Sequence, residues 1–203
     1  MNRRAMSTLR AYLLFAVLLI YPLAAGCDAG SAGEPPLAGA AIGGPFELVD
    51  SKGKTVRWSD FDGKYRMVYF GYAYCPDVCP LDVQHMMQGY KQFKAADPAL
   101  AAQVQPLFVT IDPERDTPAV VGEFTAAFSD DLVGLTGTPE QIAAAAKAFA
   151  VYYTKGEVTE NGGYMMDHSR AAYLMGRNGE PIALLPVEKD GAGVAAELER
   201  WVS

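Results

Sequence analysis

A continuous apolar segment that runs into a pair of cysteines is the feature that most constrains how this chain can fold. Residues 66–72 read RMVYFGY, a run typical of a strand that is buried on both faces. Cys75 and Cys79 follow in the sequence CPDVCP, each of them succeeded by a proline. Apolar side chains then recur at three- and four-residue spacing, which predicts a helix that begins near Cys79. The pattern therefore predicts a dithiol between the end of a buried strand and the start of a helix.

The remaining segments alternate between strand-like and helix-like patterns. We expect hairpins over 46–58 and 171–185, a buried strand over 104–112, and helices over 118–128, 139–150 and 194–201. This order predicts an α/β fold with a mixed central sheet, helices on both of its faces and an added N-terminal hairpin. A dithiol that ends a central strand and opens the next helix is the thioredoxin arrangement, so we expect a thioredoxin-like fold.

The N-terminus has the organisation of an export signal. Three arginines precede an apolar run from Ala11 to Ala25, which is shorter than the roughly 20 residues of a membrane-spanning helix. We therefore expect a lipoprotein-type signal peptide over residues 1–26, the alternative being an uncleaved signal anchor. The sequence LAAGC, which ends at Cys27, resembles a bacterial lipobox, in which the cysteine is acylated. Either alternative places the domain outside the cytoplasmic membrane.

The residues that follow the signal are expected to connect it to a single domain. Residues 27–44 are rich in glycine and lack apolar periodicity, which predicts a flexible tether, and residues 45–203 would form the domain. The expected location is the bacterial cell envelope, at the outer (periplasmic) face of the cytoplasmic membrane, with a lipid on Cys27 as anchor. The net charge is −7 and no basic run follows the signal, so nucleic acid is not expected as a partner.

The cysteine pair by itself is compatible with a disulfide, a redox dithiol or a metal site. The C-x-x-x-C spacing is one residue longer than the C-x-x-C of thioredoxin-type oxidoreductases, and it lets the two sulfurs lie apart around an ion. Since the helix N-terminus favours a thiolate, we expect Cys75 and Cys79 to be reactive and exposed.

A third ligand would favour metal, and the chain has two histidines, His85 and His168. His85 lies off the apolar stripe of its helix and is expected to be a surface residue. His168 precedes the predicted strand at 171–175, where a thioredoxin fold places its cis-proline loop against the active-site cysteines. The Gly162–Gly163 pair predicts that a mobile loop carries His168. His168 is thus the candidate third ligand.

Three motifs together resemble the Sco/SenC family of copper chaperones: YFGYAYCPDVCP, TIDPERDTP and DHSRAAYLMGRNGE. The resemblance covers roughly residue 44 to the C-terminus, and it implies that Cys75, Cys79 and His168 are copper ligands. It further implies assistance to the assembly of the CuA centre of cytochrome c oxidase, with subunit II as partner beside other envelope copper carriers or thiol reductants. Two thiolates and an imidazole suit Cu(I) and can hold Cu(II), although zinc also accepts such a set.

Several weaker candidates accompany these ligands. Asp112 and Asp116 lie at the carboxyl end of a central strand, and Asp112 and Asp167 are predicted as outer partners of the site, with capping or solvent exposure as the alternative. Four methionines could supply thioether ligands, although one of each pair is expected in the core: Met86, Met87, Met165 and Met166.

Two other functions are compatible with the dithiol. A thiol–disulfide oxidoreductase would reduce the cysteines of the copper acceptor through Cys75 and Cys79 without carrying metal. A peroxidase of the peroxiredoxin type would need threonine at position 72, where the chain has tyrosine.

Overall fold

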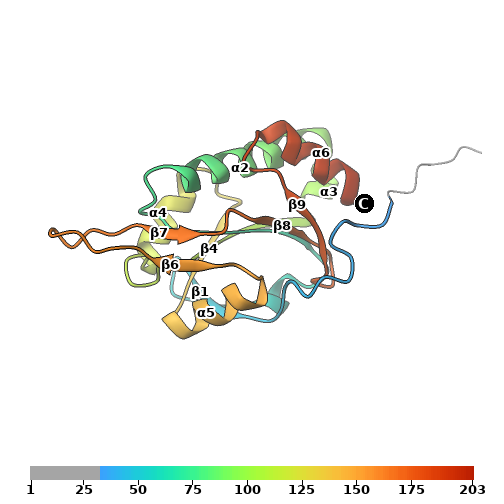
Figure 1. The fold of residues 1–203 in the computed structure, drawn as a ribbon. Coiled ribbons are helices and arrows are strands. Elements are labelled where there is room, and N and C mark those ends of the chain that lie inside the picture. Colours follow the sequence, from blue (N-terminus) through green and yellow to red (C-terminus); the bar gives the residue numbers. More distant parts are fainter. Residues whose placement is uncertain (1–32) are drawn as a thin grey trace, which may run out of the picture. The chain divides into compact units, whose positions relative to one another are not determined.

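The computed structural model describes residues 33–203, and residues Glu34–Ser203 make one compact unit. The predicted signal peptide and the acylated Cys27 lie outside the described residues. The unit is built on a seven-stranded sheet with the strand order β2-β1-β5-β4-β3-β8-β9 (Figure 1). None of the helices in residues 33–203 is both long and apolar enough to cross a membrane.

Three parallel strands form the centre of the sheet. All seven residues of β3 (Tyr65–Gly71) are buried, as the apolar run predicts. Strand β3 pairs in parallel with β4 (Val104–Thr110), which pairs in parallel with β5 (Val133–Thr136). The sequence did not reveal β5, because this strand has four residues, VGLT, and no alternating pattern. The chain reaches it from β4 through helix α4 (Pro118–Ala126), which packs on β5 and has Thr117 as N-cap.

Antiparallel hairpins complete both edges of the sheet, as predicted. At one edge β1 (Glu47–Asp50) pairs with β5 and with β2 (Thr55–Arg57), which leads into the short 3-10 helix η1 (Trp58–Phe61). At the other edge β8 (Ala172–Met175) pairs with β3 and with β9 (Pro181–Leu185). The sheet is therefore mixed, with its parallel part in the middle.

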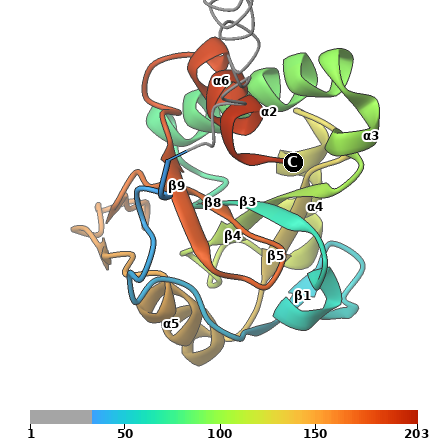
Figure 2. The same ribbon diagram turned by 90° about the vertical axis from the view of Figure 1, so that its right-hand side faces the viewer.

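Helices cover both faces of the sheet (Figures 1 and 2). Helix α2 (Val78–Ala96) and helix α6 (Gly191–Trp201) pack together on one face, near the short α3 (Pro98–Ala101), and α5 (Pro139–Ala148) lies on the other. A Cβ at Gly89 of α2 would lie 2.5 Å from the Cβ of Val194 in α6. The close approach of these two helices therefore requires glycine at position 89.

A second, two-stranded sheet projects from the end of the molecule where β3 terminates (Figure 1, left). It consists of β6 (Tyr153–Lys155) and β7 (Met166–His168), with Tyr153 opposite His168. We call residues 153–168 the projecting hairpin. The sequence predicted a loop here, because these strands have only three residues each and an exposed, polar composition. His168 instead lies in a strand, at the base of this hairpin.

The N-terminal boundary of the folded unit differs from the sequence prediction. Leu37 and Ile42 pack against the core, the Leu37 amide donates to the carbonyl oxygen of Ile182 (3.0 Å), and the Gly43 amide donates to that of Ala148 (2.8 Å). The segment expected to be a free tether up to Gly44 is thus docked on the domain from Leu37 onward. The two apolar side chains account for this, because each of them removes apolar surface from water.

Candidate metal centre

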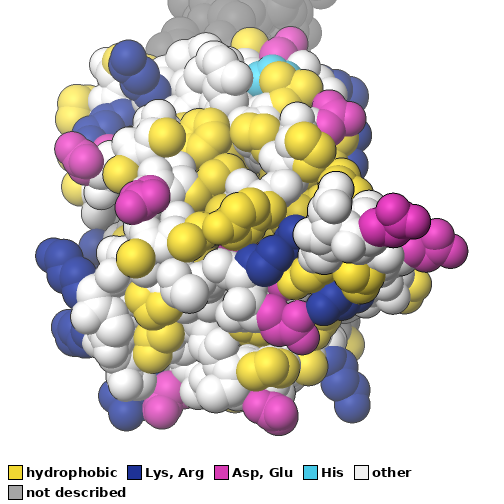
Figure 3. Space-filling model, turned by 90° about the vertical axis from the view of Figure 1, so that its left-hand side faces the viewer, with side chains coloured by type: hydrophobic (Ala, Val, Ile, Leu, Met, Phe, Trp, Pro, Cys, Tyr) yellow, Lys and Arg dark blue, Asp and Glu magenta, His cyan; other side chains and the backbone are white. Residues whose placement is uncertain are grey.

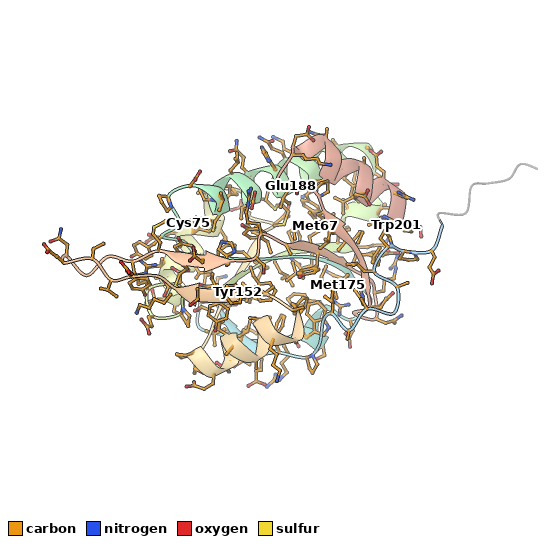
Figure 4. All side chains as sticks on the ribbon, viewed as in Figure 1. Met67, Cys75, Tyr152, Met175, Glu188 and Trp201 are labelled. Atoms are coloured by element: carbon orange, nitrogen blue, oxygen red, sulfur yellow. The ribbon has the colours of Figure 1, made fainter. Side chains whose placement is uncertain are left out.

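The two cysteines flank the junction between β3 and α2. Cys75 lies in the loop after β3, and Cys79 is in the first turn of α2, as the sequence predicts. The buried carboxylate of Asp116 holds the loop, since it accepts hydrogen bonds from the Ala73 amide (2.8 Å) and the Thr110 hydroxyl (2.6 Å). Figure 4 shows Cys75 at the end of the sheet from which the projecting hairpin extends. This end is the carboxyl end of the central strands, where α/β proteins place their sites.

His168 meets the cysteine pair from the base of the projecting hairpin. The Cys79 Sγ lies 3.1 Å from the Nε2 of His168, and the Cys79 amide donates to the Sγ of Cys75 at 3.4 Å. Both thiols are free. Within residues 33–203 no three His, Cys, Asp or Glu side chains converge as a ready-made metal site. The structure therefore makes His168 and Cys75 each a neighbour of Cys79, and it leaves the Cys75 sulfur turned toward the Cys79 amide.

Backbone and aromatic contacts fix the orientation of the His168 ring. Its Nδ1 is 2.8 Å from the carbonyl oxygen of Ser169, and since a carbonyl only accepts, Nδ1 carries the proton. Nε2 is then the acceptor that faces Cys79. The rings of Tyr69 and Tyr72 contact the imidazole edge-on, with centroid distances of 6.3 and 6.0 Å. Burial lowers the pKa of His168, which favours the neutral form that a metal ligand needs.

The thiols are more buried than the sequence analysis expected. Cys75 is 7% exposed and Cys79 is completely buried. Burial raises the pKa of Cys79, which opposes the thiolate that the helix N-terminus was expected to favour. The prediction of an exposed pair was therefore wrong, because Cys79 has no exposed surface and Cys75 has little. Only Cys75 reaches the surface.

An ion pair between a buried carboxylate and a partly exposed arginine connects the element that carries Cys79 to the segment that carries His168. Asp82, one helical turn beyond Cys79, is completely buried and accepts from the Nε (3.0 Å) and Nη2 (2.7 Å) of Arg170. The same carboxylate accepts from the Tyr69 hydroxyl at 2.9 Å. A bidentate contact of this kind fixes both position and orientation. This pair could not be predicted, because nothing in the sequence shows that residues 82 and 170 are in contact.

Arg115 anchors the projecting hairpin to the loop that carries Cys75. Its guanidinium carbon lies 3.6 Å from the ring centroid of Tyr164, 5.2 Å from that of Tyr74 and 5.7 Å from that of Tyr72. Its Nη1 donates to the Tyr164 carbonyl (2.9 Å), and its Nε pairs with Asp112. One cation thus joins three aromatic rings from both sides of the site.

The structure decides between the alternatives for the weaker candidates. Asp112 is buried and pairs with Arg115 and the Tyr164 hydroxyl (2.8 Å), so it supports the site through the hairpin. Asp167 is exposed, and the Ser169 carbonyl takes the position at His168 Nδ1 that Asp167 was predicted to fill. His85 is half-buried and bonds the Val187 carbonyl (2.8 Å), away from the site.

The surface around the site is apolar. Figure 3 looks onto this end of the unit, and hydrophobic side chains gather at its centre beside basic ones. Of the six large hydrophobic residues that are exposed within residues 33–203, five belong to the segments that frame the site: Tyr74, Leu81, Tyr152, Val158 and Met165. Any molecule that reaches Cys75 has to contact this surface.

Comparison with known proteins gives a consistent result. The family model for SCO1/SenC matches residues 34–203. Protein SenC of Rhodobacter capsulatus is 46% identical over 68% of this chain and 60% of its own length, and the chain spans about half the length of other curated relatives.

Solved structures agree with this assignment. ScoI of Bradyrhizobium japonicum with copper bound superposes with a TM-score of 0.71 at 36% identity, over 79% of this chain and 99% of that one. The thioredoxin domain of a Bacteroides vulgatus thiol-disulfide oxidoreductase superposes with a TM-score of 0.54 at 18% identity, over 80% and 96% of the two chains. The second likeness confirms the thioredoxin-like fold. From the family match and the likeness to ScoI it follows that the chain belongs to the SCO1/SenC family.

Proposed function

We propose that this chain is a copper chaperone that binds copper through Cys75, Cys79 and His168. The observation that carries the proposal is the 3.1 Å contact between Cys79 Sγ and His168 Nε2, with the Cys75 sulfur beside the Cys79 amide. Two sulfurs and an imidazole nitrogen form a soft set that suits Cu(I) and also accepts Cu(II). The copper-bound ScoI structure, which is 36% identical, supports the same cargo.

The surroundings of each ligand define its part in copper uptake. Of the two cysteines in residues 33–203, Cys75 alone reaches the surface, so it makes the first thiolate contact, and its sulfur has to leave the Cys79 amide. Cys79 then gives up its proton as its sulfur binds copper. His168 completes the set through Nε2, while the Ser169 carbonyl keeps the ring oriented. Uptake therefore releases protons, and copper affinity rises with pH.

The acceptor in this proposal is subunit II of cytochrome c oxidase, at whose CuA centre two copper ions are held. Other copper carriers or thiol reductants of the bacterial cell envelope would supply copper or electrons. A lipid on Cys27 would tether the protein at the outer face of the cytoplasmic membrane. Family membership and the apolar surface around Cys75 support a protein acceptor, because an acceptor's ligands have to approach through that surface.

The test is the metal stoichiometry and spectrum of residues 34–203, reduced and then loaded with Cu(I) or Cu(II). We expect one copper per chain and thiolate-to-copper absorption in the Cu(II) form. His168→Ala and Cys75→Ser should lose or alter this absorption, whereas His85→Ala, the matched control, should leave it unchanged. Absence of stable copper in the unmodified chain, or tight binding of zinc alone, would refute the proposal.

A thiol–disulfide reductase is the second candidate, because Cys75 and Cys79 are both free and Cys75 is near enough to affect the pKa of Cys79. This function would oxidise Cys75 and Cys79 to a disulfide while an acceptor disulfide is reduced to two thiols. It needs no histidine ligand, so His168→Ala should retain reductase activity. The chaperone proposal predicts instead that His168→Ala loses copper delivery together with copper binding.

A further inference from the structure

Met165 stands apart from the other methionines that the sequence analysis considered as ligands. Met86, Met87 and Met166 are buried and belong to the core, whereas Met165 is 50% exposed. It directly precedes β7, the strand that ends in His168. Core packing therefore accounts for three of these four thioethers and leaves the fourth at the surface beside the site.

The contacts of Met165 lead directly to the copper ligands. The Tyr72 hydroxyl lies 3.9 Å from the Met165 Sδ and accepts from the Met166 amide at 3.3 Å. The Tyr72 ring also packs edge-on against His168. The same tyrosine accepts at its carbonyl oxygen from the Cys75 amide (3.2 Å), so Tyr72 connects the exposed Met165 to both His168 and Cys75.

Because the two thiols are buried, an exposed ligand such as the Met165 thioether would help incoming copper to reach them. Cu(I) that arrives from a carrier cannot meet both cysteines at once, since Cys79 has no exposed surface and Cys75 has little. A thioether is a soft ligand for Cu(I), and unlike a thiol it carries no proton that must leave before it binds. A single thioether also holds copper weakly, so it can release the ion to a thiolate.

We infer that Met165 is a transient Cu(I) ligand at the mouth of the site, through which copper passes on its way to and from Cys75. This inference rests on the function proposed above and adds a residue to it. In the first step a bond forms between Cu(I) and the Met165 Sδ, and one ligand of the carrier leaves. In the second step the Cys75 sulfur binds copper and loses its proton to the departing carrier ligand or to water, and the Met165 bond breaks. Copper remains Cu(I) throughout.

A kinetic experiment separates this role from a structural one. The full chain, with Cys27→Ser in every variant so that only Cys75 and Cys79 supply thiols, is reduced and mixed with Cu(I) bicinchoninate. Met165→Leu should slow both loading and release by about tenfold, as expected for the loss of one interaction in a transition state. The equilibrium constant for copper binding should not change, because a ligand that holds copper only between the two end states changes the forward and reverse rates by the same factor. Met166→Leu, a buried neighbour, should leave both rates unchanged.

Each outcome has a distinct meaning. Unchanged rates in Met165→Leu, with normal copper binding, would overturn the inference and leave the proposed function intact. A weaker equilibrium affinity with unchanged loading would make Met165 a resident ligand, which also overturns it. An unmodified chain that binds no copper would refute the proposed function, and the inference with it.

A second measurement addresses Met165 without the cysteines. In the full chain with Cys27→Ser, Cys75→Ser and Cys79→Ser, methionine methyl groups labelled with carbon-13 are followed during titration with Ag(I), a soft ion of the same charge as Cu(I). The Met165 methyl resonance, assigned from its loss in Met165→Leu, should shift while that of Met166 does not. A Met165 resonance that stays in place would overturn the inference.

Discussion

The Asp82–Arg170 pair should contribute measurably to the stability of the fold near the site ligands. Arg170→Met would leave a completely buried carboxylate with the Tyr69 hydroxyl as its remaining partner. Removing one member of a buried pair costs about 3–5 kcal/mol, and because Arg170 is partly exposed we expect about 2–3 kcal/mol here. Urea unfolding of the reduced protein measures this change.

The control is a variant in which both charges are removed. Asp82→Leu combined with Arg170→Met should recover much of the lost stability, because no unpaired charge is then buried. Arg177→Met, which removes an arginine that stacks on Tyr65 but pairs with no buried carboxylate in residues 33–203, should lower the free energy of unfolding by only about 1 kcal/mol. An Arg170→Met variant with an unchanged unfolding midpoint would contradict the structural role of the pair.

His168 should make the stability of the copper-free protein depend on pH. Its pKa is lowered by burial in the folded state, so below about pH 6.5 the unfolded chain binds a proton that the folded chain resists. The free energy of unfolding should therefore be constant near neutral pH and fall as the pH drops, by at most about 1.4 kcal/mol per pH unit. Urea titrations between pH 7.5 and 5 test this. His168→Gln should remove that component, and identical slopes in both proteins would disprove the assignment.

At the scale of elements, the projecting hairpin depends on Arg115. Arg115→Leu would remove the stacking on Tyr164 and the partner of the buried Asp112. Hydrogen exchange followed by mass spectrometry should show faster exchange in residues 153–168, by about tenfold or more for a loss above 1.4 kcal/mol. Arg177→Leu is the matched control, since Arg177 stacks on Tyr65 outside the hairpin. Unchanged protection in Arg115→Leu would show that the hairpin is held by other contacts.

The elements that the sequence predicted are those whose patterns arise within one segment. The run of β3 and the periodicity of α2 are set by burial of their own side chains, and both segments occur as predicted. Strand β5 escaped prediction because its only signature is its place beside β4. The projecting hairpin escaped because its strands are short and its contacts, such as those of Arg115 with Tyr164, join residues far apart in the sequence.

The residues of the candidate site also divide into those that the sequence could reveal and those that it could not. The three ligands could be proposed because cysteine and histidine have few other uses in such a pattern: Cys75, Cys79 and His168. The residues that support the ligands could not be proposed, because arginine and tyrosine are common and their partners lie far away in the sequence: Arg170, Arg115 and Tyr72. The burial of Cys79 was also missed, since it depends on residues that are distant in the sequence, such as His168.

At the scale of the whole unit, the docked N-terminal segment is part of the folded structure. Gly43 has φ +96°, and a Cβ there would lie 2.6 Å from the Met175 Cε and 3.3 Å from the Gly179 carbonyl oxygen. Gly43→Ala should lower the free energy of unfolding by about 2–4 kcal/mol, through both strain and overlap. Gly39, with φ +74° and no neighbour within 4 Å, is the matched control. Gly39→Ala should cost only about 1–2 kcal/mol, and equal losses in urea unfolding would argue against docking at Gly43.

The projecting hairpin also has a mechanical consequence. His168 lies at its base, the turn of residues 159–163 lies at its tip, and the Arg115 contacts act between them. Such an element connects its tip mechanically to the imidazole at its base. A partner that displaces the tip would also shift His168, so a contact made far from the thiols would adjust the position of one ligand.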